Sequence, residues 1–461
     1  MKKSLFLMCM CYTCWAMAET IVPMNAQTNL NVTIYNDNRA LVKDERQVTL
    51  AKGLNELAFS GVSANMMPQT AILSGIGLTT QEQNFNFDLL NQESLLQKSV
   101  GQTVHTEYID PNGKITNNVA TLLSYNNGRP VLKIGGKIET NYPGRIVFDQ
   151  VPANLRADPT LVVSVNSEHD VNEPVQLDYL TTGMSWNADY VARLDADEKL
   201  MNLNGFVTLT NHSGTDYNNA LLQLVAGKVN TVREERIYSD NAPRKVKAVA
   251  MADGMAMEGE NLSDFYIYTV PHKTTLLSNQ TKQIALLSGT GISINKTYEL
   301  DNVFSVYSDE IAKVKPQIYL TFKNSADNKL GVPLPKGVVR LYKQDAKGRT
   351  QFVGEDRIYH TANDETIRLK MGEAFNLTGS MKRTSFNKVS DKVTTAGFEV
   401  TLKNGSDAPV TVDVKQSFPN GYKLMEQSVE SEKLTSNQVK WKVQVPAKGD
   451  IKFTYKVRWG D

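Results

Sequence analysis

Cysteine is scarce in this sequence. Only three cysteines occur in 461 residues, and all of them, Cys9, Cys11 and Cys14, lie close to the N-terminus. The rest of the chain therefore excludes structural disulfides, zinc sites built from cysteines and a thiol nucleophile. A chain of this length can fold without disulfides because its hydrophobic core is large enough.

Long apolar runs are also missing, apart from one at the start. The first residues contain two lysines, an apolar run from Leu5 to Trp15, and the small residues Ala16 and Ala18. This order is typical of a bacterial secretory signal peptide, and the run is shorter than the ~20 residues that span a bilayer. We expect cleavage after Ala18, a mature chain without a transmembrane segment, and a location in the periplasm, outside the cell or at its surface.

The chain lacks an excess of either charge, with 50 basic and 49 acidic side chains. This balance argues against nucleic acid as a partner, because such proteins need a concentrated basic surface. The chain also lacks a phosphate-binding glycine loop, a dinucleotide fingerprint and a G-x-S-x-G elbow, and its five histidines are scattered. We therefore predict no cofactor, no metal site and no identifiable catalytic residue.

What the sequence does contain is a pattern of short strands. Alternating runs rich in Val, Thr, Ile, Tyr and Phe are interrupted by Asn-Gly and Pro-Gly turns, which predicts a mainly β fold of several stacked sandwich or barrel modules. One short helix is expected near 91–101, where Leu95, Leu96 and Val100 precede Gly101.

Turns and composition divide the chain into successive segments. In order, we expect a signal peptide (1–18), an N-terminal β domain (19–100), a small Sm-like barrel (101–150), a central β domain (159–384) and a β-sandwich (385–461). A stretch of small residues and methionines at about 233–263 interrupts the central domain. It predicts a mobile insertion, or a loop that binds a partner through its methionines.

One stretch resembles a catalytic cluster. "FVTLTNHSGTDY" (206–217) holds His212, Ser213 and Asp216 within a few positions. Related patterns occur in "GFEVTLKNGSDAPVTVDVKQ" (397–416) and, more loosely, in "IYLTFKNSADNKLGVPL" (318–334), where His212 is replaced by Gly405 or Ser325. The shared features predict a turn in which Asn and Asp bind the backbone, and not a nucleophile with its base.

Several motifs together resemble a known family. "LDYLTTGMSWNADYVARLD" (177–195) and "GVPLPKGVVRLYKQD" (331–345) are similar to the bacterial secreted family DUF4139, a domain of unknown function. The similarity extends from about 160 to the C-terminus, and the leading segment is also similar. The resemblance implies an envelope-exported, β-rich protein and supplies no catalytic residues.

Two groups of residues are candidates for binding. Trp186 and Tyr190 are four apart, so in a strand they share a face, either in the core or as a stacking platform for carbohydrate or peptide. The segment 354–372 is dense in charge. It predicts paired surface strands, or alternatively a binding groove or catalytic carboxylate; its candidate residues are Glu355, Asp356, Arg357 and His360.

Function is less constrained than fold. The modular β pattern and the lack of cofactor motifs favour a non-enzymatic binding or structural module for an envelope protein or a cell-wall glycan. The alternative is an envelope hydrolase that uses surface carboxylates such as Glu355 or Asp356.

The signal peptide gives a direct prediction. The mature protein begins at Glu19, because Ala16 and Ala18 form the small-residue cleavage site. N-terminal sequencing of the periplasmic fraction checks this, and an intact Met1 there would contradict it.

Overall fold

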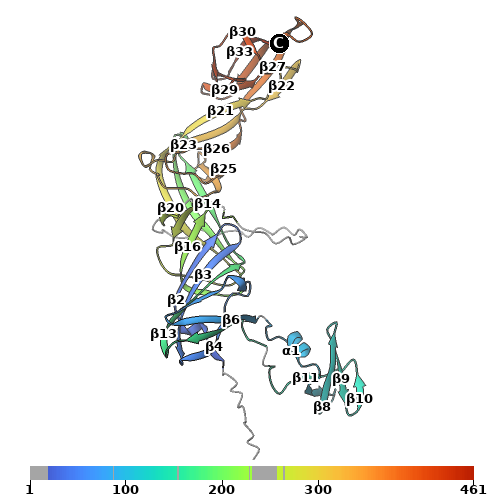
Figure 1. The fold of residues 1–461 in the computed structure, drawn as a ribbon. Helices are drawn as coiled ribbons and strands as arrows, with labels where there is room; N and C mark the ends of the chain where they lie inside the picture. Colours follow the sequence, from blue (N-terminus) through green and yellow to red (C-terminus); the bar gives the residue numbers. More distant parts are fainter. Residues whose placement is uncertain are drawn as a thin grey trace, which may run out of the picture. The chain divides into compact units, whose positions relative to one another are not determined.

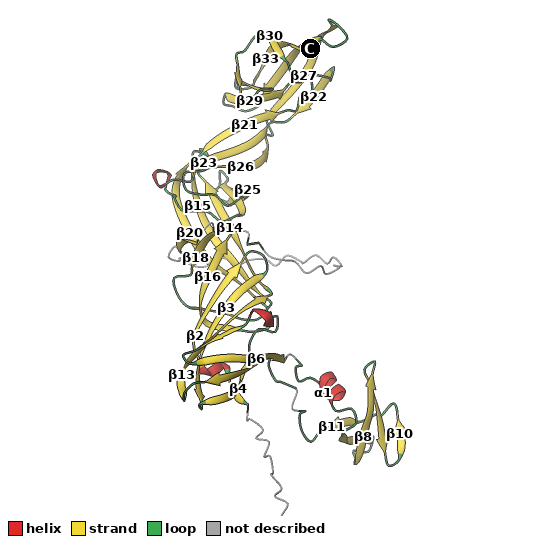
Figure 2. Cartoon of the chain, viewed as in Figure 1, coloured by secondary structure: helices red, strands yellow, loops and turns green. Residues whose placement is uncertain are grey.

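The fold is mainly β, as expected. A computed structural model describes residues 19–86, 88–152, 155–227, 229–230, 257–262 and 265–460. Strands dominate these residues, and α1 is the single α-helix among them (Figures 1 and 2). The expected signal segment 1–18 lies outside the described residues, and so does the expected insertion at 233–263 apart from a short piece that contains β17 (Glu258–Leu262).

The chain forms two compact units. Unit 1 comprises residues within 1–186, 209–225 and 267–282, and unit 2 comprises residues within 187–208, 226–266 and 283–461. In the part of the chain that the structure describes, no helix is long and apolar enough to cross a membrane.

Two sheets of unit 1 combine strands from distant parts of the sequence. The first has the order β1-β4-β12-β6, with β1 at Thr20–Val22, β4 at Gly53–Ser60, β12 at Thr160–Ser167 and β6 at Leu78–Asn86. The second contains β18 (Phe265–Thr269), β16 (Tyr217–Ala226), β2 (Gln27–Tyr35), β3 (Arg39–Leu50), β13 (Val171–Thr182) and β5 (Ile72–Ser74) in this order, and β19 (Thr274–Leu276) pairs with β16. Short 3-10 turns lie at Met24–Ala26 and Pro68–Thr70.

These pairings join two segments that the sequence analysis assigned to separate domains, the N-terminal β domain (19–100) and the central β domain (159–384). Strand β12 pairs with β4, so that Leu161 lies opposite Phe59, and β13 pairs along the whole of β3. Residues 19–86 and 160–182 therefore share sheets within unit 1.

The segment between them forms a small sheet of its own. Its order is β10-β9-β8-β7-β11, with β10 at Lys137–Glu139, β9 at Arg129–Ile134, β8 at Ile115–Asn126, β7 at Thr103–Ile109 and β11 at Arg145–Val147. The five expected strands are present, but β10 and β11 are both edge strands, so the sheet is open. The expected closed barrel is wrong here, because these two three-residue strands do not pair with each other.

Helix α1 (Gln92–Lys98) confirms the helix predicted near 91–101. Asn91 caps it by accepting a hydrogen bond from the Ser94 amide at 2.9 Å, while the Ser94 hydroxyl accepts one from the Asn91 amide at 3.0 Å. This capping box satisfies amides that the first turn would leave unpaired. Buried Leu96 packs with Val104 and Leu122 of the small sheet.

Three further sheets lie wholly or mostly in unit 2. One has the order β20-β15-β14-β24-β25, with β20 at Gln280–Ser293, β15 at Leu200–Asn211, β14 at Met184–Leu194, β24 at Gly337–Gln344 and β25 at Thr350–Ile358. The next has the order β26-β23-β21-β29-β32-β31, with β26 at Thr366–Glu373, β23 at Gln317–Lys323, β21 at Asn295–Asp301, β29 at Val410–Ser417, β32 at Gln438–Val445 and β31 at Ser431–Lys433. The third has the order β22-β27-β28-β33-β30, with β22 at Glu310–Val314, β27 at Leu377–Lys388, β28 at Thr394–Asn404, β33 at Gly449–Trp459 and β30 at Lys423–Gln427. A 3-10 turn lies at Ala326–Asn328.

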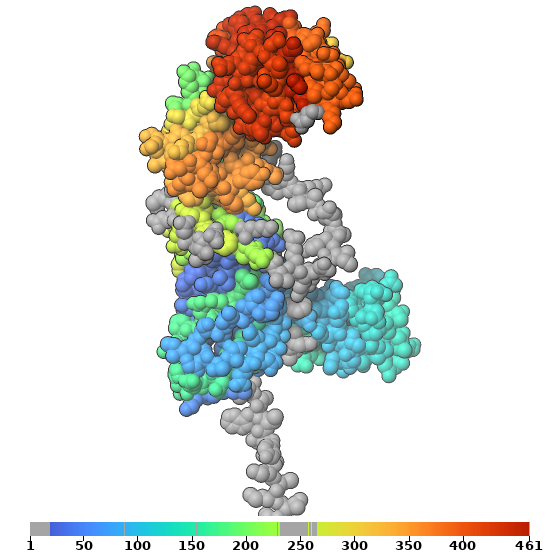
Figure 3. All heavy atoms as spheres, turned by 45° about the horizontal axis from the view of Figure 1, so that its top comes forward, coloured from blue at the N-terminus to red at the C-terminus, as the bar shows by residue number. Residues whose placement is uncertain are grey.

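The last two sheets share one aromatic core and form the predicted sandwich, drawn from yellow to red in Figure 3. Alternate residues of β33 point inward, and Tyr455 stacks on Trp441 with ring centroids 4.8 Å apart. Burial of such rings is a large stabilising contribution. Strands β21 to β23 and β26 also belong to these sheets, so the sandwich starts near residue 295, well before the expected 385.

A buried ion pair joins the sheets of unit 1. Strand β3 alternates between buried and more exposed residues, and two of its buried positions hold Asp44 and Arg46. Arg46 donates to one Asp44 oxygen from Nε at 3.0 Å and from Nη2 at 2.7 Å. Its Nη1 donates to the carbonyl oxygens of Val22 and Ser60, both at 2.7 Å. Arg46 therefore ties β3 to the ends of β1 and β4 in the other sheet.

Removal of Arg46 should be costly. Arg46→Ala leaves Asp44 buried without its partner, and breaking a buried pair in this way costs about 3–5 kcal/mol. Arg39→Ala on the same strand is the control, because the Arg39–Asp37 pair is partly exposed and 4.0 Å long and is expected to contribute less than about 1 kcal/mol. Hydrogen exchange of the β3 and β4 amides measures both, and equal losses would contradict the structural role of Arg46.

Candidate functional site

A candidate site lies on one side of the sheet β20-β15-β14-β24-β25. Along β14, Ala188, Tyr190 and Ala192 are buried, whereas Asp189 and Arg193 point to the opposite side. Paired residues of neighbouring strands share a side, so the register of β14, β24 and β25 extends this surface across the sheet. We call the following residues the outer face: Asp189, Arg193, Thr208, Arg340, Tyr342, Phe352 and Glu355.

Hydrogen bonds and ion pairs form a polar row across the outer face. Asp189 accepts a hydrogen bond from the Thr208 hydroxyl and another from Arg340, both at 2.8 Å. Arg340 also pairs with Glu355 at 3.4 Å. The hydrogen bond to Asp189 raises the pKa of Arg340, and this effect outweighs the opposing effect of partial desolvation. A single guanidinium thus holds both carboxylates of the outer face.

An aromatic pair lies farther along the same strands. The rings of Tyr342 and Phe352 meet edge to face with centroids 5.7 Å apart, and Phe352 is 56% exposed. A β-bulge shifts the register between Leu341 and Tyr342, so that Phe352 lies opposite Tyr342. Gly354 lies at this irregularity with φ +151°, where a Cβ atom would come within 2.3 Å of the Met371 carbonyl oxygen. Only glycine fits there, and the bulge aims the aromatic pair.

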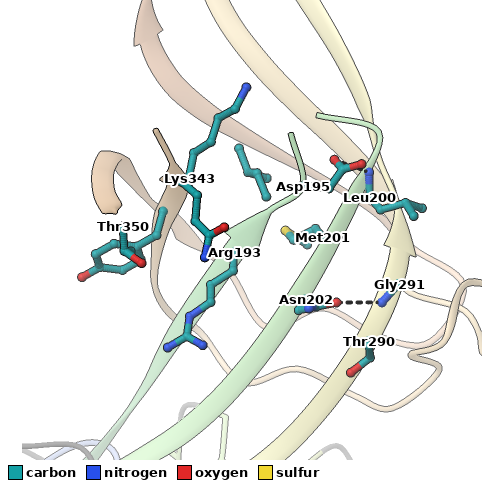
Figure 4. Close-up of a pocket in the computed structure, with 12 residues that line it drawn as sticks. Arg193, Asp195, Leu200, Met201, Asn202, Thr290, Gly291, Lys343 and Thr350 are labelled. Atoms are coloured by element: carbon teal, nitrogen blue, oxygen red, sulfur yellow. Dashed lines mark hydrogen bonds between the residues drawn. The ribbon is translucent and has the colours of Figure 1, made fainter. Parts of the chain in front are cut away.

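A groove of about 540 Å³ adjoins the aromatic pair. Arg193, Asn202, Thr290 and Tyr342 are among its lining residues, and Figure 4 shows the first three rising from neighbouring strands. Asn202 accepts a hydrogen bond from the Gly291 amide at 2.9 Å, and its own amide group, which has no acceptor among the described residues, can donate to a ligand. The groove therefore combines a cation, amide and hydroxyl groups, and an aromatic ring, which is a suitable lining for a hydroxyl-rich ligand.

Trp186 and Tyr190 share the inward side of β14, as predicted, but both are fully buried. The Trp186 ring nitrogen donates to the Val225 carbonyl oxygen at 3.3 Å, and the Tyr190 hydroxyl donates to that of Pro335 at 2.8 Å. A ring with no exposed surface cannot stack on a ligand. Of the two roles considered for this pair, the structure therefore supports core packing, and the stacking platform is wrong.

The structure does not gather the four charged candidates into one site. Glu355 lies on the outer face, and Arg357, two residues farther on, is exposed. Asp356 instead accepts a hydrogen bond from the Lys370 amide of β26 at 2.7 Å. His360 lies beyond β25 and accepts one from the Lys336 amide at 3.3 Å; partial desolvation and the charge of Lys336 lower its pKa. Asp356 and His360 thus support the backbone.

Most of the outer face was missed by sequence reasoning. Asp189 and Arg193 occupy the positions of β14 that alternate with Trp186 and Tyr190. The sequence could therefore have predicted that they point to the opposite side of the strand from the two aromatic residues. The residue pattern offered no comparable signal for Phe352, because its pairing with Tyr342 depends on the bulge.

The stretch 206–217 is a turn, as predicted. Buried Asn211 donates to the carbonyl oxygens of Thr215, Leu276 and Leu277 at 2.9–3.3 Å. Its side-chain oxygen accepts from the amide and the hydroxyl of Ser213, at 3.0 and 2.7 Å. Ser213 is fully buried, so it is not placed to attack a ligand.

The two related patterns repeat this arrangement. Asn404 donates to the carbonyl oxygens of Ala408 and Pro446 at 2.8 and 3.0 Å and accepts from the Ser406 amide at 2.9 Å. Asn324 donates to the carbonyl oxygens of Val332 and Ala362 at 2.8 and 2.9 Å. Each asparagine is the last residue of a strand or follows it directly, and each is buried. The residue that the three turns share, and that stabilises them, is therefore the asparagine and not the histidine.

The turn predicts opposite results for neighbouring residues. Asn211→Ala deprives several buried backbone groups of a partner, at about 1–3 kcal/mol for each unsatisfied group. His212→Gly should change stability by less than about 1 kcal/mol, because the ring is exposed and, among the described residues, makes a single hydrogen bond, at 3.1 Å to Asn279. Urea unfolding of the two variants compares them, and a larger loss for His212→Gly would overturn the role of the asparagine.

Comparison with known proteins gives a family and no activity. A family model described as a domain of unknown function, DUF4139, matches residues 175–460, which is more than half of the chain. No match to the chain is found among curated proteins. Among the described residues, no group of three or more His, Cys, Asp or Glu side chains is placed to hold a metal ion.

Proposed function

The chain belongs to the DUF4139 family, and from the geometry of the outer face we propose that it is an exported, non-enzymatic module that binds an envelope glycan. The signal-like first residues support export. The groove and the outer face are the proposed binding site, and a saccharide is the proposed occupant.

The row formed by Arg193, Tyr342 and Phe352 supports this function best. Arg193 lies opposite Tyr342 in the parallel pairing of β14 and β24, and Tyr342 lies opposite Phe352. The apolar side of a sugar ring packs on an exposed aromatic ring, while its hydroxyl groups bond to amides and guanidinium groups nearby. Neighbouring strands lie about 4.8 Å apart, so the row is long enough for more than one sugar ring.

The carboxylates of the outer face fit a binding role better than hydrolysis. Canonical glycoside hydrolysis needs one carboxyl group that delivers a proton and a second that acts as nucleophile or base. Asp189 and Glu355 are instead both engaged by Arg340. We therefore assign them to holding the strands and the site in place.

Loss of Phe352 should weaken binding. Phe352→Ala removes an aromatic surface, which is expected to lower affinity about tenfold if the ring contributes about 1.4 kcal/mol. Calorimetric titration of residues 19–461 with neutral oligosaccharides of glucose and N-acetylglucosamine, and with oligomers of galacturonate and mannuronate, measures this.

Phe375→Ala is the matched control, because this ring is 85% exposed but lies outside the outer face, between β26 and β27. Binding of no saccharide in the set, or an equal loss in both variants, would contradict a glycan site on the outer face.

A further inference from the structure

Arg193 carries a charge that the protein leaves unused. Its side chain is exposed and lines the groove. Among the described residues it has no ion pair, hydrogen bond or ring contact. The other cation that lines the groove, Lys343, is bound to Glu198 at 3.0 Å. Arg193 is therefore the cation available to a ligand there.

The charges around the groove leave a positive excess. Glu198 pairs with two ammonium groups, those of Lys296 and Lys343. Its burial opposes ionisation, but the two lysines outweigh this effect and lower its pKa. Asp195, the one carboxylate that lines the groove, accepts hydrogen bonds from the amides of Lys199 and Leu200 at 2.8 and 3.0 Å. Among the residues that line the groove, one carboxylate thus stands against two cations, Arg193 and Lys343.

The chemistry of arginine narrows the ligand further. A guanidinium group is a planar fork of donors that matches a carboxylate with two parallel hydrogen bonds, which an ammonium group cannot do. Arg193 lies at one end of a row whose other members are the rings of Tyr342 and Phe352. A ligand that fills this row presents its acidic group at the β14 end and a ring face at the β25 end.

We propose that the ligand is an acidic saccharide that contains a uronic acid, whose carboxylate binds Arg193; this inference rests on the proposed function. The aromatic rings hold the saccharide, and Arg193 selects its charge. Neutral saccharides can occupy the same row but lack a negatively charged partner for Arg193.

The test compares oligogalacturonate and oligomannuronate with their methyl esters, in which the carboxylate is neutral and the sugar backbone is unchanged. We expect the acids to bind about 10- to 100-fold more tightly than the esters, which is the range of a hydrogen bond to a charged group. Arg193→Gln should remove this preference, so that acids and esters bind with equal affinity. Arg193→Lys should retain only part of it, because lysine keeps the charge and loses the fork.

Arg458→Gln is the matched control, because Arg458 is an exposed strand arginine on β33 and has no partner among the described residues. It removes the same net charge and should leave the preference intact. An equal effect of Arg193→Gln and Arg458→Gln would show a general charge effect and overturn the assignment of Arg193.

The outcomes separate the two proposals. Esters or neutral oligosaccharides that bind as tightly as the acids, with a loss in Phe352→Ala, would overturn the acidic ligand and leave the glycan site standing. Binding of no saccharide would overturn both. An acid preference that Arg193→Gln abolishes, together with weaker binding of acids and esters in Phe352→Ala, is the result expected from both.

Discussion

The structure depends on satisfying the backbone groups that its long strands leave unpaired at their ends. Buried polar groups without a partner are costly, so a chain built from strands needs a device for each exit from a sheet. Asn211, Asn324 and Asn404 supply it in the same way, with a side-chain amide that donates to carbonyl oxygens of the turn or of a neighbouring segment. The device is found in both units. It accounts for the repeated sequence pattern without any catalytic role.

Three arginines show how burial and partners decide what a charged side chain does. Arg46 is fully buried, and Asp44 and backbone carbonyl oxygens bind its donors, so it joins sheets. The Arg340 side chain is 38% exposed and pairs with two carboxylates, so it holds side chains of the outer face in place. Arg193 is exposed and has no partner among the described residues. Only the third can offer its full hydrogen-bonding capacity to a ligand.

The alternation of strands links core and site in unit 2. Side chains alternate along β14, so Tyr190 points into the core while its neighbours Asp189 and Val191 point to the opposite side. The same alternation that buries one aromatic residue therefore displays Asp189 and Arg193 on the outer face. A β-bulge then brings Phe352 opposite Tyr342 and completes the row. Core packing on one side of the sheet and the proposed binding surface on the other follow from one pattern.

The sequence by itself determined the mainly β fold, the short helix, the presence but not the extent of the terminal sandwich, and the turn at 206–217. These are local properties: alternation, capping and turn chemistry act between residues that are close in the chain. Of the candidates that the sequence named, Glu355 and Arg357 lie on the same side of β25 as the outer face. Tertiary structure decided the rest. It placed β4 beside β12, left the small sheet open, buried Trp186 and Tyr190, and brought Asp189 to Arg340. The residues of a single strand divide into two sides, but the strand alone does not show which side faces the core. Pairing between strands that are far apart in the sequence leaves no local sequence pattern.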